Sequence, residues 1–192
     1  VNDHGFTFIG PNIDHIENMA NKIKAKSLAE KIGLPIIPGS TKNIETLKDA
    51  KKISEKIGYP IIIKSTNGGG GRGIKIVKNE KELKKNLELA RKEAEQSFGN
   101  NEVYIEKYIQ NPRHIEIQII GDKFGNIIHL GERECSIQRR NQKIVEECPS
   151  PVISEEEREK ICRLTLEAMK KIKYFNLGTV EYLYKDGNFY FI

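Results

Sequence analysis

The chain has 192 residues, of which 31% are charged, and this length suffices for one large domain or two small ones with a real hydrophobic core. No apolar run approaches the length of a transmembrane helix and the first residues lack the apolar stretch of a signal peptide, so the sequence predicts no membrane association. The net charge is +5, but lysines alternate with glutamates at i, i+4 spacing, as in Glu88/Lys92 and Glu156/Lys160, which is typical of solvated helix faces and argues against nucleic-acid binding.

Cysteine usage and the first residue bear on where the protein works. Cys135, Cys148 and Cys162 are odd in number and form no C-x-x-C pair, which favours a reducing, cytoplasmic environment over a disulfide framework or a zinc site. The chain begins at Val1 rather than at a methionine. We therefore expect it to be a piece of a longer protein.

Two helices with the same ending are predicted in the first third of the chain, over about 18–32 and 43–57. Each has a lysine in its last turn and stops at a glycine, Gly33 or Gly58, after which a proline starts a strand. Leu47, Ala50, Ile53 and Ile57 give the second helix its apolar stripe.

A glycine-rich loop between two β-branched runs is the most informative motif. The isoleucines at 61–63 are followed by Lys64, and glycines occupy positions 68–71 and 73. A second short strand is predicted at 74–77. Consecutive glycines let the backbone aim its N–H groups at a ligand, and the charges of Lys64 and Arg72 suit a polyphosphate. A flexible linker is the alternative, but linkers are not bracketed by two strands. The pattern therefore predicts a hairpin lid over nucleotide phosphates, ordered only when nucleotide binds.

The rest of the chain reads as one long helix, several strands and a second helix. A capping-box pattern at 79–82 opens the long helix, and another at 154–157 opens a helix carrying Ile161, Leu164, Ala168 and Ile172. Strands are predicted at 103–109, 114–120, about 127–130, 179–185 and 189–192. Short turns join most of them, so this sheet should be largely antiparallel. The sequence therefore predicts an α+β protein whose residues 38–109 form a small α/β lobe, with a nucleotide in the cleft beside the larger lobe.

Two segments carry candidate site residues. Glu106, Lys107, Tyr108 and Ile109 end a strand where the lobes meet, and such a hinge can present backbone groups to an adenine edge, although an ordinary strand end fits the pattern as well. The stretch 132–151 is denser in charge than a fold requires.

This charged stretch has two interpretations. It is either an exposed, salt-bridged loop or an anion clamp in which Gln138, Arg140 and Lys143 converge on a small anion and a nucleotide.

These motifs together resemble the biotin carboxylases, which include the corresponding parts of acetyl-CoA, propionyl-CoA and pyruvate carboxylases and their separate subunits. The shared order runs from Gly5-Phe6 and Phe8-Ile9-Gly10-Pro11 to Phe189-Tyr190-Phe191-Ile192, and it includes Lys64 with the glycine loop, Glu106-Lys107-Tyr108, Asn111 to Glu116, Gln138-Arg139-Arg140 and Gln142-Lys143. The resemblance covers nearly the whole chain and implies an ATP-grasp fold: 1–37 as the tail of an N-terminal domain with a connecting helix, 38–109 as the lid lobe, and 110–192 as a truncated core lobe.

The resemblance also implies an activity and its partners. ATP would activate bicarbonate to carboxyphosphate, and the carboxyl group would pass to biotin on a carrier protein, with a carboxyltransferase as a further partner. A nucleotide-binding module without chemistry, or a carbamoyl-phosphate-synthetase-like domain, is the alternative.

Roles for single residues follow from the same match. Lys22 and Lys64 would hold ATP phosphates beneath the Gly70-Gly71 backbone, while Glu106 to Ile109 would meet the adenine. His114 and Gln138 would line the nucleotide, Lys143 and Arg140 would act on bicarbonate, and Glu181 would hold Mg²⁺ or Mn²⁺. For Lys22 alone, an exposed helix lysine is the simpler interpretation.

Two departures from the family pattern stand out. Asn141 replaces the usual histidine beside the ATP phosphates, and it donates a hydrogen bond but cannot become cationic. The chain also stops before the Glu-x-Asn-x-Arg motif, so we expect this piece alone to be inactive. To bring the glutamate of that motif opposite Glu181, we predict a three-residue loop at 186–188, with Lys185 opposite Phe189.

Overall fold

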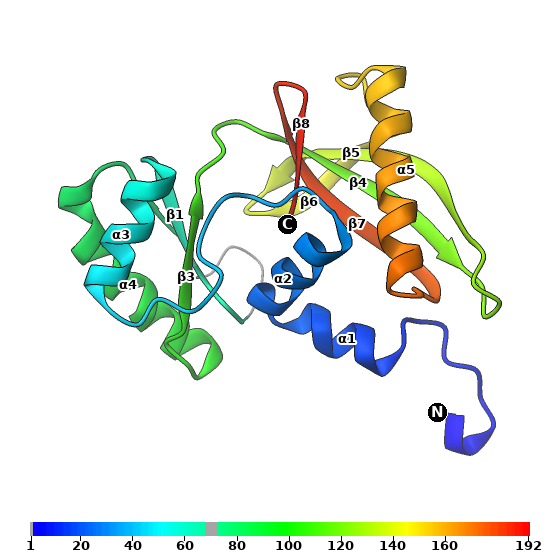
Figure 1. Cartoon of the computed structure of the whole chain (residues 1–192), viewed down its shortest axis with the longest axis horizontal. Helices are drawn as coiled ribbons and strands as arrows, with labels where there is room; N and C mark the ends of the chain where they lie inside the picture. The colour runs from blue at the N-terminus through cyan, green and yellow to red at the C-terminus, as the bar shows by residue number, and fades with distance from the viewer. Residues whose placement is uncertain (1, 68–72) are drawn as a thin grey trace.

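The computed structural model describes residues 2–67 and 73–192, which form two β-sheets with helices packed on one face of each (Figure 1). A three-stranded sheet has the order β2-β1-β3, and a five-stranded sheet has the order β6-β5-β4-β7-β8. Every pairing between neighbouring strands is antiparallel. The predicted α+β class and the antiparallel character of the second sheet are confirmed.

The smaller sheet is built from β1 (Ile61–Ser65), β2 (Lys75–Val77) and β3 (Val103–Lys107). Helices α3 (Leu47–Ile57) and α4 (Glu80–Phe98) cover one of its faces. On that face Ile61, Ile63 and Ile105 are fully buried, and burying a side chain of this kind contributes about 1.5–3 kcal/mol. Because side chains alternate along a strand, Lys64 and Glu106 point to the opposite face.

The larger sheet is built in the same way around α5 (Glu155–Lys171). Its strands are β4 (Arg113–Gly121), β5 (Ile127–Arg139), β6 (Gln142–Glu147), β7 (Asn176–Lys185) and β8 (Asn188–Phe191). Ile115, Ile117 and Tyr182 pack under α5 in one core cluster. Glu116 and Glu181 pair across β4 and β7 and therefore share the other face of the sheet.

Two short helices, α1 (Ile13–Ala20) and α2 (Lys22–Ile32), follow a 3₁₀ turn, η1 (Asn2–His4). In Figure 1 α2 lies near the middle of the molecule, and α1 lies below it and below the larger sheet. The prediction of one helix over 18–32 was therefore wrong at its start. The reason lies at Asn21, whose side-chain oxygen accepts from the backbone N–H groups of Ile23 and Lys24 at 3.0 and 3.1 Å. An asparagine that caps a new helix in this way ends the preceding one.

Capping also sets the ends of the later helices. Thr46 caps α3 with Asp49 in a reciprocal capping box, so this helix begins at Leu47 rather than at 43. The box at Ser154 and Glu157 is present as predicted. At Asn79 the side chain makes no cap bond, and the carboxylate of Glu82 instead accepts from the N–H of Lys78.

The final hairpin has a two-residue turn, so the predicted three-residue loop is wrong. Lys185 pairs with Asn188 and Tyr184 with Phe189, and the N–H of Ile192 donates to the carbonyl of Glu181 at 3.2 Å. Asp186 and Gly187 have φ of 48° and 78°. Two successive residues with positive φ give a turn whose twist matches that of the flanking strands, which is why this turn prevails over a longer loop.

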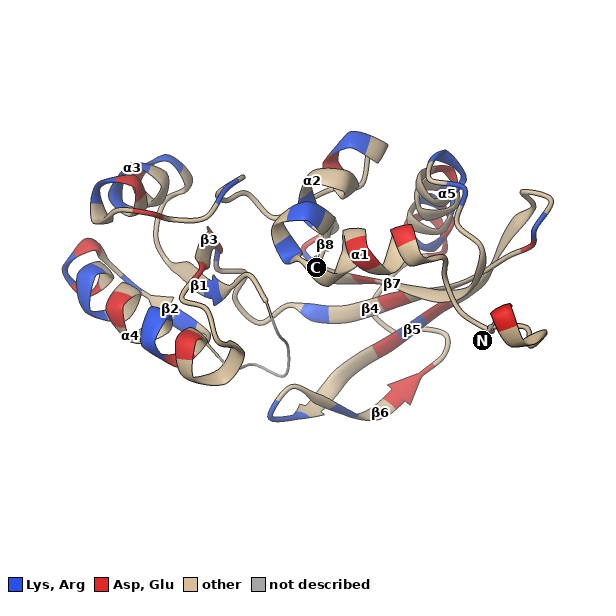
Figure 2. Ribbon diagram, turned by 90° about the horizontal axis from the view of Figure 1, so that it is seen from below, with Lys and Arg blue, Asp and Glu red and all other residues tan. Residues whose placement is uncertain are grey.

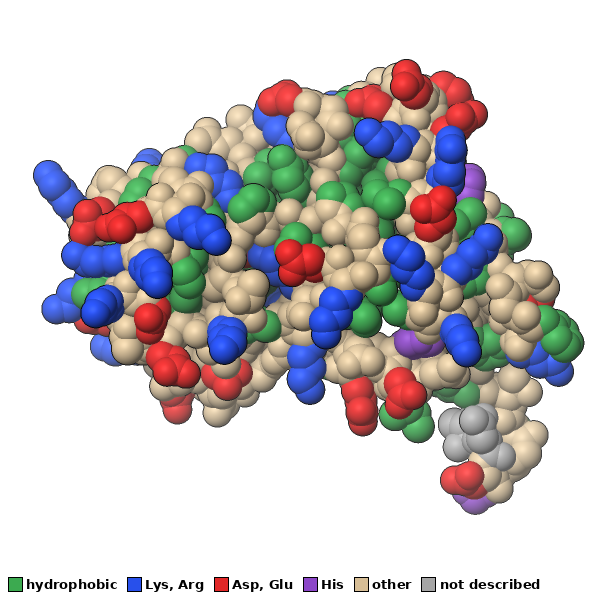
Figure 3. Space-filling model, in the orientation of Figure 1, with side chains coloured by type: hydrophobic (Ala, Val, Ile, Leu, Met, Phe, Trp, Pro, Cys, Tyr) green, Lys and Arg blue, Asp and Glu red, His purple; other side chains and the backbone are tan. Residues whose placement is uncertain are grey.

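The surface carries both signs of charge. Blue and red segments alternate along α3 and α4 in Figure 2, and the face shown in Figure 3 has acidic and basic side chains interspersed. None of the helices in the described residues combines the length and the apolar character that crossing a membrane would require.

Candidate active site

One cavity of about 850 Å³ is lined by the polar faces of both sheets and by α1 and α2. From the smaller sheet come Ile62, Lys64, Tyr104 and Glu106, which lie on the face turned away from α3 and α4. The cavity brings together seven of the residues that the sequence predicted for the site: Lys22, Lys64, Glu106, His114, Gln138, Asn141 and Glu181.

The first charged cluster in the cavity consists of Lys26, Lys64 and Glu106, and we call it the Glu106 cluster. The two oxygens of Glu106 accept from different lysines, Oε1 from Lys26 Nζ at 2.7 Å and Oε2 from Lys64 Nζ at 2.8 Å. Glu106 is 5% exposed. Burial opposes its charge, but the two ammonium groups outweigh that effect and lower the pKa of Glu106. The cluster therefore holds one carboxylate against two cations.

Lys22 adds a third cation beside this cluster. Its Nζ lies 3.5 Å from the carbonyl oxygen of Ser65, and its backbone N–H donates to the carbonyl of Thr66 at 3.2 Å. Burial, followed by the charge of Lys64, lowers the pKa of Lys22. Surplus positive charge at a half-buried site favours an anion with several negative charges.

The hinge after Glu106 is placed differently from the expectation. The side chain of Lys107 turns away from the cavity, and its Nζ donates to the carbonyls of Gly58 and Tyr59 at 3.1 and 2.9 Å. The backbone N–H of Lys107 donates to Pro38 O and that of Tyr108 to Pro60 O, at 2.8 and 3.1 Å. These two N–H groups are therefore engaged within the protein, and Lys107, Tyr108 and Ile109 do not line the cavity in the described structure.

The second charged cluster consists of Glu116, Lys143 and Glu181, and we call it the Lys143 cluster. Lys143 Nζ donates to Glu116 and to Glu181, the latter at 2.6 Å. Burial works against the charge of Lys143, but its hydrogen bonds to both carboxylates outweigh that effect and raise the pKa of the lysine. Lys143 therefore stays cationic at physiological pH and cannot serve as a base.

Arg133 completes the charge balance of this cluster. Glu116 is 2% exposed and accepts from Arg133 Nε at 2.6 Å as well as from Lys143. Burial disfavours its charge, yet these hydrogen bonds lower the pKa of Glu116. Arg133 also donates to Gln118 at 3.0 Å. Two cations thus face two carboxylates, and the cluster has no surplus positive charge.

His114 of β4 and Gln138 of β5 lie beside the Lys143 cluster, and Gln138 pairs with Lys143 across the β5–β6 hairpin. Gln138 Nε2 lies 3.0 Å from His114 Nδ1 and 2.7 Å from the carbonyl oxygen of Cys135. With Nδ1 accepting from the amide, the ring proton belongs on Nε2, which lies 3.7 Å from Glu181 Oε2. The nearby ring of His114, followed by the hydrogen bond from Lys143 and against some burial, lowers the pKa of Glu181 to about 2.

These side chains bear on metal binding. The ligand atoms of His114, Glu116 and Glu181 lie within 4.8 Å of one another. Glu116 is saturated by Arg133 and Lys143, whereas Glu181 lines the cavity and is ionised. An ionised carboxylate is the type of ligand that Mg²⁺ and Mn²⁺ prefer, so Glu181 fits the metal-binding role that the family resemblance implies.

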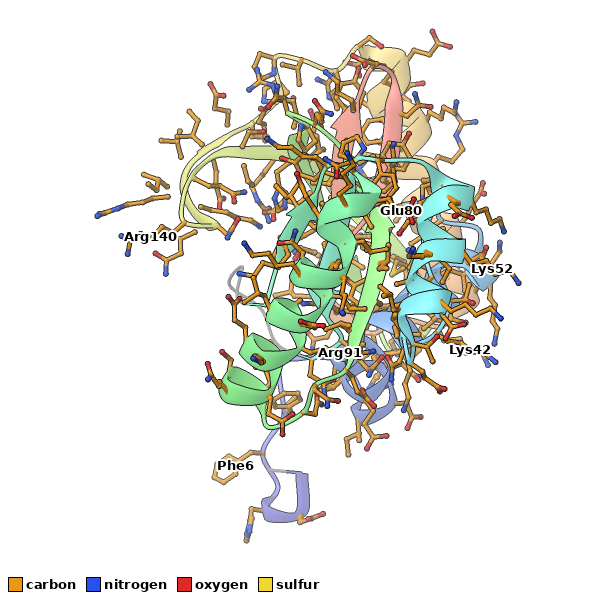
Figure 4. All side chains as sticks on the ribbon, turned by 90° about the vertical axis from the view of Figure 1, so that its left-hand side faces the viewer. Phe6, Lys42, Lys52, Glu80, Arg91 and Arg140 are labelled. Atoms are coloured by element: carbon orange, nitrogen blue, oxygen red, sulfur yellow. The ribbon has the colours of Figure 1, made fainter. Side chains whose placement is uncertain are left out.

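Arg140 and Lys143 do not line the cavity, whereas Asn141, the neighbour of Arg140 in the chain, does. Arg140 and Asn141 form the tip of the β5–β6 hairpin, with φ of 52° and 64°. Arg140 is exposed and points away from the molecule in Figure 4. Lys143 reaches the cavity only through Glu181. Gly70 and Gly71, with the rest of the predicted lid, lie outside the described residues.

Sequence reasoning missed Lys26, Glu116 and Arg133. Glu116 lies between Ile115 and Ile117 in an apolar strand, and an acid in that setting needs a partner once it is buried. Lys26 follows Lys22 by one helical turn, so the two share a helix face. Neither signal identifies the partner, because those contacts join segments far apart in sequence.

The sequence of this chain is similar to proteins of a known family. The family model described as the carbamoyl-phosphate synthase L chain, ATP binding domain, matches residues 21–192. A pyruvate carboxylase from Bacillus subtilis is 50% identical over 190 residues, which cover 99% of this chain and 17% of that protein.

Two solved structures match the whole chain. One is the biotin carboxylase domain of the Hydrogenobacter thermophilus 2-oxoglutarate carboxylase in complex with MgADP, ADP and bicarbonate, with a TM-score of 0.93 and 48% identity. The other is a Campylobacter jejuni biotin carboxylase in complex with a nucleotide, with a TM-score of 0.93 and 47% identity. The chain covers 42% and 43% of these two proteins. It therefore belongs to the family of carbamoyl-phosphate synthase L chain ATP-binding domains, and within that family it corresponds to the ATP-grasp portion of the biotin carboxylases.

Proposed function

We propose that this chain supplies the nucleotide and bicarbonate sites of a biotin carboxylase, which carboxylates biotin on a carrier protein at the expense of ATP. The observation that carries the proposal is the single cavity into which both charged clusters open, the Glu106 cluster directly and the Lys143 cluster through Glu181. A relative of 48% identity and the same fold is described with MgADP and bicarbonate. The chain spans less than half of its relatives, so the activity belongs to the complete protein.

At the nucleotide end, Lys22 and Lys64 bind the ATP phosphates and the Gly70-Gly71 backbone covers them. The surplus positive charge around Glu106 supports this assignment. The adenine meets the segment from Glu106 to Ile109. Since the N–H groups of Lys107 and Tyr108 are engaged elsewhere, carbonyl groups and the N–H of Ile109 are the groups left for the base edge. His114 and Gln138 line the nucleotide, with Asn141 near its phosphates.

At the other end, Lys143 binds bicarbonate and stabilises the negative charge that develops as the anion attacks the terminal phosphate of ATP. Its raised pKa keeps it protonated for this purpose. Glu181 holds Mg²⁺ or Mn²⁺, which neutralises charge on the phosphates. Arg140 contributes a further positive charge if the hairpin tip turns inward.

Charge balance links the metal to bicarbonate. Lys143 is shared by two carboxylates, so an incoming anion must compete with Glu181 for it. A cation bound by Glu181 satisfies that carboxylate and releases Lys143 to the anion. Metal and bicarbonate should therefore bind cooperatively.

The complete protein has further partners in this proposal. A biotin carboxyl carrier protein presents the acceptor, and a carboxyltransferase domain or subunit consumes the product in the cytoplasm. We also propose the division into 1–37, 38–109 and 110–192, in which the two sheets belong to different lobes.

The test measures ADP release by the complete protein with MgATP and biotin, with and without bicarbonate. We expect release to depend on bicarbonate and to rise with biotin. Bicarbonate-independent ADP release, or none, would contradict the proposal, and a carbamoyl phosphate product would favour the carbamoyl-phosphate-synthetase-like alternative.

A further inference from the structure

We propose that Lys26 is a positioning residue for nucleotide binding, which keeps Lys64 available to phosphate by sharing the buried carboxylate of Glu106. The inference rests on the proposed nucleotide site. Lys26 belongs to α2, Lys64 to β1 and Glu106 to β3, so three separate elements meet at one carboxylate.

The position of Glu106 is fixed by the backbone on both sides. Within the smaller sheet it pairs with Ile62 of β1, and on its other side it forms an isolated bridge with Gly39. A Cβ on Gly39 would lie 2.4 Å from the carbonyl oxygen of Ile105, so only glycine allows this close approach. The carboxylate is therefore a fixed point to which the lysines adapt.

A buried carboxylate with a single lysine partner would hold that lysine tightly. The side chain of Glu106 is 6% exposed, and removing its last partner would leave an uncompensated buried charge, which is strongly unfavourable. If Lys64 were that only partner, a phosphate would have to break the pair. Lys26 removes this obstacle, because its ammonium stays on Oε1 while Lys64 on Oε2 turns to the ligand.

Lys26 is suited to this role because it is itself buried beside the carboxylate. Its side chain is 11% exposed, compared with 18% for Lys64. Both lysines line the cavity, but Lys26 lies one helical turn from Lys22, on the α2 face that contacts β1 and β3. The less exposed lysine thus serves the carboxylate, and the more exposed one is left for the ligand.

The test compares variants of the complete protein in MgATP and adenosine binding, both measured by displacement of a fluorescent ATP analogue without bicarbonate. We expect Lys26→Met to weaken MgATP binding by about tenfold or more, because Glu106 then retains Lys64. Adenosine has no phosphate, so its affinity should change by less than about threefold. Lys26→Arg should restore MgATP binding, and Lys24→Met, which removes an exposed charge from the same helix, is the matched control.

A double-mutant cycle tests the mechanism itself. In a Glu106→Gln background there is no carboxylate charge to share, so adding Lys26→Met should have less than about a threefold further effect. Equal losses of MgATP and adenosine binding, wild-type binding by Lys26→Met, or the same loss in the Glu106→Gln background would each overturn the inference. If Lys26→Met does not fold, Lys26→Gln undergoes the same comparisons. Failure of the unmodified protein to bind MgATP would refute the proposed function instead.

Discussion

The two charged clusters of the cavity use the same residue types in opposite proportions. In the Glu106 cluster two lysines share one carboxylate, whereas in the Lys143 cluster two carboxylates share one lysine, and Arg133 only restores neutrality there. The carboxylates at the centre of each, Glu106 and Glu116, are almost equally buried at 5% and 2% exposed. Burial does not distinguish the clusters, so their difference lies in charge.

This difference in charge supports the different ligands that we propose for the two clusters. A cluster with surplus positive charge binds a polyphosphate directly, because the ligand supplies the missing negative charge. A balanced cluster gains little from an anion alone and needs a cation first, since otherwise the anion displaces a carboxylate from Lys143. The proposed function therefore places a polyphosphate and a metal-dependent bicarbonate at opposite ends of one cavity.

The largest expected effects are on ATP cleavage and on MgATP affinity, and they differ between Lys143 and Lys64, one lysine from each cluster. In the complete protein, Lys143→Ala should lower bicarbonate-dependent ATP cleavage by about 10²–10³-fold, because it removes a positioned charge at a developing anion. MgATP affinity should change by less than about threefold, whereas Lys64→Ala should lose MgATP affinity itself.

Steady-state ADP release and MgATP titration measure the two quantities separately. Lys123→Ala, at an exposed turn outside the cavity lining, is the control and should behave as the unmodified protein. Turnover by Lys143→Ala at the normal rate, or a parallel loss of nucleotide binding, would remove the distinction between the clusters.

How far sequence predicts this site depends on whether a contact is local. The capping box at Ser154, the alternation of β4 and the loop flanked by β1 and β2 are local patterns, and they placed the strands that carry Lys64, Glu106, His114 and Glu181. The Lys26–Glu106 contact joins residues 80 positions apart, and no periodicity in α2 indicates it.

Other features were missed for related reasons. Strand β6 was read only as a charged stretch, because three of its six side chains are charged and nearly all are exposed. The Asn21 break was missed because asparagine, although it favours caps, also occurs within helices, and only the bonds to Ile23 and Lys24 identify the cap here.

The next prediction concerns the metal at the balanced cluster. Glu181→Gln should raise the Mg²⁺ concentration needed for half-maximal ATP cleavage by about 10–100-fold, because the ionised ligand is lost. The bicarbonate requirement should no longer depend on Mg²⁺ in this variant, because no carboxylate at position 181 is left to compete with the anion for Lys143. Titrations of Mg²⁺ at several bicarbonate concentrations, on this variant and on the unmodified protein, test this, with Glu156→Gln as an exposed control. If Mg²⁺ and bicarbonate titrate independently of each other in the unmodified protein, Glu181 does not hold Lys143 when the metal is absent, and the proposed coupling is wrong.

A smaller effect is expected on the free energy of unfolding when the turn between β7, which carries Glu181, and β8 is altered. Gly187→Ala should lower the free energy of unfolding by about 1 kcal/mol, because alanine resists the φ of 78° found there although the site has space for a methyl group. Asn188 pairs with Lys185 within the ladder, so Asn188→Ala should cost about 0.5 kcal/mol or less. Urea denaturation ranks the two variants, and the reverse order would indicate the three-residue loop.

The smallest effect is a pH dependence of stability that arises at Glu181. Its pKa of about 2 lies below the ordinary value of 4.5, chiefly because of the nearby His114 ring and then of the hydrogen bond from Lys143. Between these values the unfolded chain binds more protons than the native one, so this stabilisation is complete above about pH 5 and is lost as the pH falls towards 2. The side chain is 37% exposed, so solvent screening limits the contribution to less than about 1 kcal/mol. Urea denaturation of the unmodified protein and of Glu181→Gln, from pH 6 to the lowest pH at which both fold, should give curves that converge as the pH falls. Parallel curves would mean that Glu181 titrates normally and that its pairs with His114 and Lys143 do not persist in solution.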